Sequence, residues 1–119
     1  MEMGVTGTEQ VQLAEFDISV HALAEMRNTD AAHTILDIRR PDELAVCMIP
    51  GSVTIPMQQV MDEFELLSRE RTLILVCHHG TRSGLVAEFL RNNGFENVWN
   101  LAGGIDAWSE QIDPAMPRY

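Results

Sequence analysis

The central stretch of the sequence reads Leu73-Ile74-Leu75-Val76-Cys77-His78-His79-Gly80-Thr81-Arg82-Ser83. Its first four residues are apolar and have the length of a buried strand, whereas the apolar residues of 85–91 follow helical spacing. Cys77 is therefore expected where a strand ends, and a polar loop leads from it into a helix. Backbone N–H groups and the positive end of a helix collect at such a loop, and both favour a negatively charged sulfur atom. Cys77 is thus a candidate nucleophile.

Strands and helices are expected to alternate along the rest of the chain. Residues with high β-propensity predict strands at 16–18, 33–38, 52–55, 72–76 and 97–101. Helical spacing, with Ser19 as an N-cap and Pro41 as a first helical residue, predicts helices at 20–27, 41–46, 57–67, 85–91 and 105–112. This alternation indicates an α/β fold, with a mainly parallel five-stranded sheet and helices on both faces. We expect a single domain over residues 1–119, with a flexible arm at 1–12 and a tail at 113–119.

Asp37 and Cys77 both follow predicted strands, so a parallel sheet would bring them to the same edge. Asp37 and Arg39 could then tune the site from the neighbouring strand. The structural alternative is favoured: Arg39 would pair with Glu43 four residues on, and Asp37 would accept hydrogen bonds from the backbone of the loops.

Composition limits the partners and the compartment. The 119 residues carry a net charge of −10, which argues against nucleic acid and anionic membranes as partners. No apolar run approaches the ~20 residues of a membrane span, and residues 1–10 lack the pattern of a secretory signal. Two cysteines without such a signal favour a cytoplasmic protein with free thiols. We expect a monomer, since no long exposed apolar stripe is evident.

Residues 78–83 provide the candidate binding groups beside Cys77. The N–H groups of residues 78–82 could hold an anion, and Gly80 permits a backbone angle or a close approach that a side chain would forbid. Thr81 or Ser83 could cap the following helix. Arg82 could bind an anionic substrate through its planar fork or could bond to loop carbonyls, and the sequence leaves both roles open.

The adjacent His78 and His79 cannot easily face the same pocket. One of them could polarise the substrate or add positive charge, and each could equally be a solvated loop residue. A metal site is not expected, because Cys77, His78 and His79 are consecutive and cannot surround one zinc ion tetrahedrally. No cofactor is expected either.

The spacing between Cys77 and Arg82 bears on the chemistry. Cysteine phosphatases have Cys-x5-Arg around a tetrahedral phosphoryl group, whereas four residues separate Cys77 from Arg82. The shorter loop should fit a single sulfur atom better than a tetrahedral oxyanion. A phosphatase or arsenate reductase is therefore an alternative enzyme, and a non-enzymatic sulfur-carrier or regulatory module is an alternative of another class. A merely buried cysteine is disfavoured by the polar loop that follows it.

Four motifs occur in order between residues 16 and 112. They are Asp37-Ile38-Arg39 with Pro41 and Glu43; Ile49-Pro50-Gly51-Ser52 with Ile55-Pro56; Cys77-x-x-Gly80-x-Arg82-Ser83; and Gly94-Phe95-Glu96-Asn97-Val98 with Leu101-Ala102-Gly103-Gly104-Ile105-Asp106-Ala107-Trp108. Together they resemble the single-domain rhodanese-like sulfurtransferase family, and four ordered motifs are far more specific than any one of them.

The resemblance implies a thiosulfate sulfurtransferase of the rhodanese type. Cys77 would attack the outer sulfur of a small anionic donor such as thiosulfate and would carry that sulfur as a persulfide. The loop N–H groups would hold the persulfide, and Arg82 would bind the donor. The acceptor would be cyanide in an assay, and a thiol or a sulfur-carrier protein otherwise.

Cys47-Met48 replaces the Gly-His pair that usually precedes Ile-Pro-Gly in this family. This departure could be a packing change, or Cys47 could be a resolving thiol for Cys77. The tail at 113–119 resembles the ends of rhodanese domains that are fused to sulfur-carrier activating enzymes.

Overall fold

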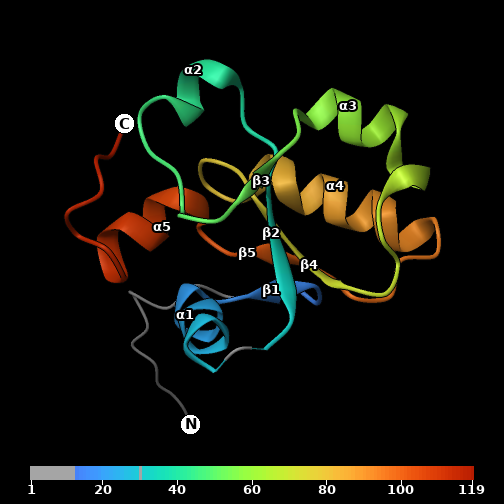
Figure 1. The fold of residues 1–119 in the computed structure, drawn as a ribbon, viewed down its shortest axis with the longest axis horizontal. Coiled ribbons are helices and arrows are strands. Elements are labelled where there is room, and N and C mark those ends of the chain that lie inside the picture. The colour runs from blue at the N-terminus through green and yellow to red at the C-terminus, as the bar shows by residue number, and fades with distance from the viewer. Residues whose placement is uncertain (1–12, 30) are drawn as a thin grey trace, which may run out of the picture.

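The computed structural model describes residues 13–29 and 31–119, so the arm predicted at 1–12 lies outside the described residues. Strands and helices alternate along the described chain (Figure 1). The strands are β1 (Asp17–Ile18), β2 (His33–Asp37), β3 (Val53–Thr54), β4 (Thr72–Val76) and β5 (Val98–Leu101). The helices are α1 (Val20–Asn28), α2 (Pro41–Leu44), α3 (Met57–Asp62), α4 (Thr81–Asn92) and α5 (Gly104–Gln111), and a 3₁₀ turn, η1 (Phe64–Leu66), follows α3.

The strands form one sheet in the order β1-β5-β4-β2-β3, and every neighbouring pair is parallel. Strand β4 lies at the centre and pairs with β2 from Thr72 opposite His33 to Val76 opposite Asp37. The C-terminal ends of these two strands therefore meet at one edge, which brings Asp37 and Cys77 together as predicted. The α/β prediction is confirmed, and the sheet is entirely rather than mainly parallel.

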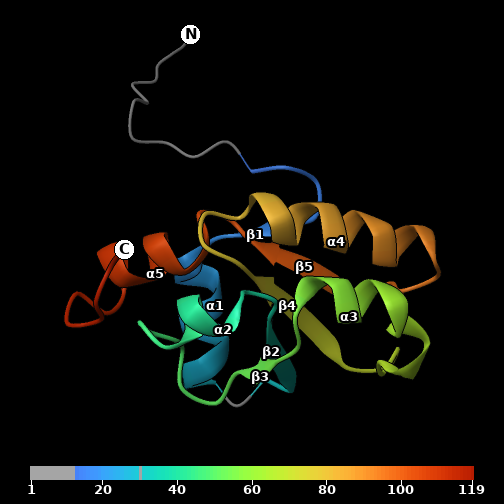
Figure 2. The same ribbon diagram turned by 90° about the horizontal axis from the view of Figure 1, so that it is seen from above.

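Helices cover both faces of the sheet, as predicted (Figure 2). Alternate side chains of a strand point to opposite faces, and β4 supplies both cores in this way. Leu73 and Leu75 pack with α3 and α4, whereas Ile74 and Val76 pack with α1 and α5. This burial on both faces explains why the strand before Cys77 is apolar throughout.

Two predicted helices are shorter in the structure. The amphipathic segment 57–67 divides into α3 and η1, because Glu63 has a φ of −124° and interrupts the α-helix. Its apolar side chains still pack on the core, so helical spacing located the buried face but not the break. Helix α2 ends at Leu44 instead of Val46, and Ala45 closes it with an N–H bond to the carbonyl of Pro41.

Helix α4 begins at Thr81, four residues earlier than predicted. Thr81, Arg82 and Ser83 therefore form its first turn, and the loop between β4 and α4 consists of residues 77–80. Within the described residues, no helix combines the length and the apolar character that crossing a bilayer requires.

The segment 113–119 folds back along α5 to the edge of the sheet that carries Cys77. The side chain of Met116 is buried in the core, and its carbonyl accepts a hydrogen bond from Ser109 Oγ at 2.6 Å. Arg118 forms a two-point ion pair with Asp106, with both N–O distances at 3.0 Å. The segment predicted as a tail is thus anchored to the domain.

Candidate active site

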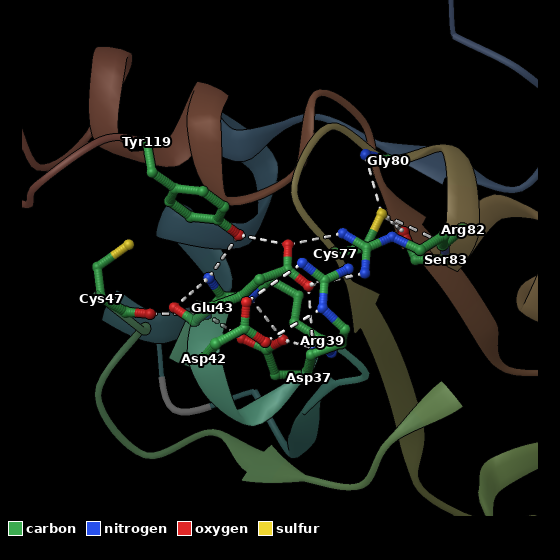
Figure 3. Close-up of polar contacts among 11 residues, drawn as sticks. Asp37, Arg39, Asp42, Glu43, Cys47, Cys77, Gly80, Arg82, Ser83 and Tyr119 are labelled. Carbon is green, nitrogen blue, oxygen red and sulfur yellow. Dashed lines mark hydrogen bonds and ion pairs between the residues drawn. The ribbon is translucent and has the colours of Figure 1, made fainter. Parts of the chain in front are cut away.

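Cys77 lies directly after β4 and is 1% exposed (Figure 3). Two N–H groups donate to its Sγ, that of Gly80 at 3.1 Å and that of Ser83 at 3.4 Å, and Oγ of Ser83 lies 3.2 Å from it. Both N–H groups are main-chain groups at the start of α4, where the helix dipole is positive. The loop therefore surrounds the sulfur atom with groups that stabilise negative charge on it.

Glycine is required at position 80 both by the backbone angle and by the lack of space for a side chain. Its φ is +97°, a left-handed angle that residues with a side chain rarely adopt. A Cβ at this position would also lie 3.1 Å from the N of Gly103 and 3.2 Å from the carbonyl oxygen of Leu101. Glycine thus lets the loop turn tightly enough to aim its N–H at Cys77.

The start of α5 holds the opposite side of the loop. The N–H of Ile105 donates to the carbonyl of Cys77 at 2.9 Å, and the N–H of Asp106 donates to the carbonyl of His78 at 3.1 Å. These bonds satisfy the loop carbonyls, so the loop N–H groups remain directed toward the sulfur atom. The sequence alone did not reveal this support.

Ser83 does not cap α4, and neither does Thr81, so this expectation was wrong. The N-cap of α4 is Gly80, without a side-chain capping bond. The side chain of Ser83 is buried and bonds instead to Cys77 Sγ and to Asn100 Oδ1. A cap is not needed here, because Sγ accepts bonds from N–H groups at this helix end.

Asn100 is a site residue that sequence reasoning missed. It lies on β5, and its Nδ2 donates to Asp17 Oδ1 at 2.9 Å and to the carbonyl of Gly80 at 3.1 Å. With its amide nitrogen committed to two acceptors, its oxygen faces Ser83. The signal that could have found it is a polar side chain within an otherwise apolar strand.

Arg82 bonds to the carboxylate of Glu43 and not to loop carbonyls, which was one of the two roles that the sequence left open. Its Nη1 and Nη2 lie 2.8 and 2.9 Å from Glu43 Oε1 and Oε2 (Figure 3). Hydrogen bonds from Arg82 lower the pKa of Glu43 to about 2 despite the opposing effect of burial. Binding of a donor by Arg82 stays a prediction.

Arg39 pairs with Asp37 and not with the carboxylate of Glu43, which corrects the predicted ion pair. Its Nε and Nη2 donate to the two oxygens of Asp37 at 2.9 and 2.8 Å, and both side chains are fully buried. Arg39 reaches only the main-chain carbonyl of Glu43, at 3.3 Å, and also binds the carbonyl of Cys47 at 2.7 Å. As expected, Asp37 accepts a backbone N–H, from Arg39 at 3.2 Å. The pair thus joins the loops after β2 and fits the favoured structural role.

Tyr119 is the second residue that sequence reasoning missed. Its hydroxyl donates to Glu43 Oε2 at 2.9 Å and accepts from Arg39 Nη1 at 3.0 Å, so it connects the two ion pairs (Figure 3). Burial is the main cause that raises the pKa of Tyr119 to about 12. Nothing in the sequence singled out this position, since only the folding back of 113–119 brings it to the site.

His78 and His79 lie on the α5 side of the loop. The ring of His78 stacks on that of Tyr119, with centroids 3.8 Å apart and planes at 12°, and its Nε2 lies 3.0 Å from the main-chain oxygen of Tyr119. His79 is largely exposed, and its Nδ1 is 4.0 Å from Asp106. The two rings also contact each other, with centroids 3.8 Å apart, so His78 lies between Tyr119 and the more exposed His79.

Cys47 and Cys77 are both free thiols. In Figure 3 Cys47 and Cys77 lie on opposite sides of Glu43 and Arg39. Cys47 packs against the core on the α1 and α5 face, which fits the packing interpretation better than a resolving role. Among the described residues, no group of three His, Cys, Asp or Glu side chains could hold a metal ion.

A groove of about 460 Å³ lies between the cysteine loop, α4 and the segment before β1. Gly80 and Thr81 form one wall, Phe16 and Asp17 another, and Leu85 of α4 is exposed beside it. The groove adjoins Gly80, whose N–H bonds to the sulfur atom.

The protein is thus a parallel α/β domain in which N–H groups at the start of a helix donate to a cysteine sulfur. Residues 19–111 match the family described as the Rhodanese-like domain, which is most of the chain. The chain belongs to this family.

Two named relatives and one crystal structure show the same similarity. The chain is 34% identical over 98 residues to YtwF of Bacillus subtilis, a protein named as a candidate sulfurtransferase, covering 82% of this chain and 94% of YtwF. It is 32% identical over 96 residues to the adenylyltransferase and sulfurtransferase MOCS3 of Drosophila virilis, covering 74% of this chain and 21% of MOCS3. A crystal structure of a rhodanese-related protein from Thermoplasma volcanium has a TM-score of 0.73 and 33% identity, covering 81% of this chain and 92% of that one. The chain spans only 21 to 30% of the length of several curated relatives that it matches.

Proposed function

We propose that the protein is a sulfurtransferase that carries sulfur as a persulfide on Cys77. The observation that supports this most strongly is the pair of main-chain N–H groups that donate to Sγ at the start of a twelve-residue helix. Such donors stabilise an anionic sulfur atom without a metal or a separate base. The names of YtwF and of MOCS3 as sulfurtransferases agree with the proposal.

The first step is attack of the Cys77 thiolate on the outer sulfur of a sulfane donor, for which thiosulfate is the simplest assay substrate. A bond forms between Sγ and the outer sulfur, the S–S bond of the donor breaks, and its electron pair leaves on sulfite. In the second step a nucleophile attacks the terminal sulfur of the persulfide, and Cys77 recovers the electron pair as a thiolate. No net oxidation of the protein occurs, and no cofactor takes part.

The acceptor is proposed to be cyanide in an assay and a thiol or a sulfur-carrier protein otherwise. The net charge of −10 disfavours nucleic acid and anionic membranes as partners. We also propose that the protein is a monomer and that it acts in the cytoplasm. Resemblance of segment 113–119 to domains fused with sulfur-carrier activating enzymes, together with the match to MOCS3, favours a sulfur-carrier protein among these acceptors.

A phosphatase or arsenate reductase receives less support from the site. Such an enzyme needs an arginine whose fork is open to a tetrahedral oxyanion, whereas the terminal nitrogens of Arg82 bind Glu43. The loop is also one residue shorter than Cys-x5-Arg.

Intact-mass analysis tests the proposal. Incubation with thiosulfate should add the mass of one sulfur atom, and cyanide should remove it. Cys77→Ala should show no adduct, whereas Cys47→Ala should behave like the wild type and serves as the matched control. Absence of an adduct from every sulfane donor, or an adduct that survives in Cys77→Ala, would refute the proposal.

A further inference from the structure

The positive charge of Arg82 is already compensated within the protein. Both of its terminal nitrogens bind Glu43, whose side chain is only 4% exposed. Since the pKa of Glu43 lies at about 2, its carboxylate is charged at every pH at which the protein would work. The tyrosine hydroxyl of Tyr119 donates to the same carboxylate and holds it in place. Arg82 and Glu43 together therefore present no net charge beside Cys77.

The other arginines around the loop have carboxylate partners as well. These pairs are Arg39 with Asp37, Arg40 with Asp42, and Arg118 with Asp106. Of the two loop histidines, His78 is engaged by Tyr119, and His79 lies beside Asp106. In this part of the described structure the arginine and carboxylate charges balance, and the whole chain carries −10. The loop must therefore stabilise anions mainly through its neutral N–H groups.

The charge that the loop must accommodate depends on the donor. A thiolate and thiosulfate bring three negative charges together, and the same three remain on the new persulfide and the departing sulfite. A thiolate and a singly charged organic persulfide, R–S–S⁻, bring together two. In that reaction Sγ bonds to the outer sulfur, the S–S bond of the donor breaks, and its electron pair leaves on the thiolate R–S⁻. A site with neutral N–H donors, and with every nearby arginine already paired to a carboxylate, stabilises two negative charges better than three, so it favours the organic persulfide reaction.

We propose that this site selects a sulfane donor of the organic persulfide class, singly charged or neutral, over the thiosulfate dianion, a selectivity that rests on the sulfurtransferase function proposed above. Glu43 is the residue that sets this preference, because it withholds the charge of Arg82 from the substrate. It acts through Arg82 and is a positioning residue.

Glu43→Gln tests the role of the Glu43 carboxylate. The amide keeps one of the two acceptor oxygens, so it can still accept from Arg82 and from either the N–H of Arg40 or the hydroxyl of Tyr119, while the other oxygen becomes an NH2 group and the negative charge is lost. The rate of sulfur uptake by Cys77 should be measured by rapid quench and intact mass with thiosulfate and with 2-hydroxyethyl persulfide generated in the assay. We expect the thiosulfate rate to rise about tenfold, as for release of one partly screened unit charge, and the persulfide rate to change less than about threefold.

Asp42→Asn is the matched control. It removes one negative charge from the same helix, but Asp42 is exposed and pairs with Arg40 rather than with Arg82. Both uptake rates should stay within about twofold of the wild type. An equal change of both rates in Glu43→Gln, or a fall of the thiosulfate rate alone, would overturn the proposal.

The salt dependence of the wild-type protein gives an answer even if Glu43→Gln fails to fold. Between about 20 mM and about 0.5 M salt, the thiosulfate rate should stay constant or rise, because no net positive charge attracts the dianion. A steep fall with salt would overturn the proposal and leave the sulfurtransferase function intact. Failure to take up sulfur from either donor would instead refute the sulfurtransferase function itself.

Discussion

Two regions beside each other at the edge of the sheet differ in how they are built. The cysteine loop, residues 77–83, surrounds Sγ with donors that are close in sequence and uncharged. The ion-pair cluster, formed by Asp37, Arg39, Glu43, Arg82 and Tyr119, joins charged groups from distant parts of the chain. The loop can stabilise a new negative charge, whereas the charges of the cluster are already matched. We therefore expect substitutions of the groups that contact Sγ to affect chemistry and substitutions in the cluster to affect stability or selectivity.

The largest effect is expected from Asp37→Asn in the cluster. The substitution leaves the fully buried guanidinium of Arg39 without its carboxylate, and breaking a buried pair from one side costs about 3–5 kcal/mol. Urea denaturation should show this loss of the free energy of unfolding. Asp42→Asn breaks an exposed pair on the same side of the domain and should leave the urea midpoint almost unchanged. Equal losses in the two variants would contradict the distinction between buried and exposed pairs.

Lowering the pH should remove the contribution of the Glu43 carboxylate to the free energy of unfolding. Its pKa falls from 4.5 in the unfolded chain to about 2 in the folded protein. The folded state therefore gains stability above about pH 4.5, and this gain of up to about 3 kcal/mol is lost as the pH falls toward 2. Urea midpoints of the wild type and of Glu43→Gln should differ at pH 7 and converge near pH 2.5. A difference that stays constant over this range would show that the charge of Glu43 does not stabilise the fold.

A smaller effect is expected from Ser83→Ala in the loop. The substitution removes a hydroxyl that lies 3.2 Å from Sγ and also bonds to Asn100, while the two N–H donors to Sγ remain. The Cys77 thiolate competes with Asn100 for the single hydroxyl proton, and a hydrogen bond to a charged group contributes about 1.5 kcal/mol, so sulfur uptake should slow by up to about tenfold. Thr81→Ala changes a neighbouring hydroxyl for which the structure gives no bond to Sγ, and it should react at the wild-type rate. Unchanged uptake in Ser83→Ala would mean that the N–H groups alone set the reactivity of Cys77.

The sequence predicted the fold well because the fold depends on local patterns. Apolar residues at 73–76 marked the central strand, and helical spacing located the faces of α1, α3 and α5. The position of Cys77 at a strand end, and the need for Gly80 after it, also follow from neighbouring residues. Local patterns did not reveal the break at Glu63 or the early start of α4, where hydrogen bonds within the folded loop determine the boundary.

The partners of the charged side chains were predicted less well. Arg39 was expected to pair with Glu43 and instead binds Asp37, while Glu43 binds Arg82. Spacing along a helix favours partners three or four residues apart, but a buried arginine binds whichever carboxylate the fold presents in a two-point geometry. Asn100 and Tyr119 were missed for the same reason, since their partners lie 17 to 83 residues away.

The sequence by itself determined the parallel α/β domain, its family and the cysteine at the end of its central strand, because strands, helices and turns are encoded by residues within a few positions of one another. Tertiary structure alone decided that Glu43 compensates Arg82, that Asn100 orients Ser83 and that Tyr119 closes the cluster. Hydrogen bonds and ion pairs act over a few ångströms in space irrespective of separation along the chain. Their partners are therefore fixed only when β2, β4, β5 and the C-terminal segment meet at one edge of the sheet.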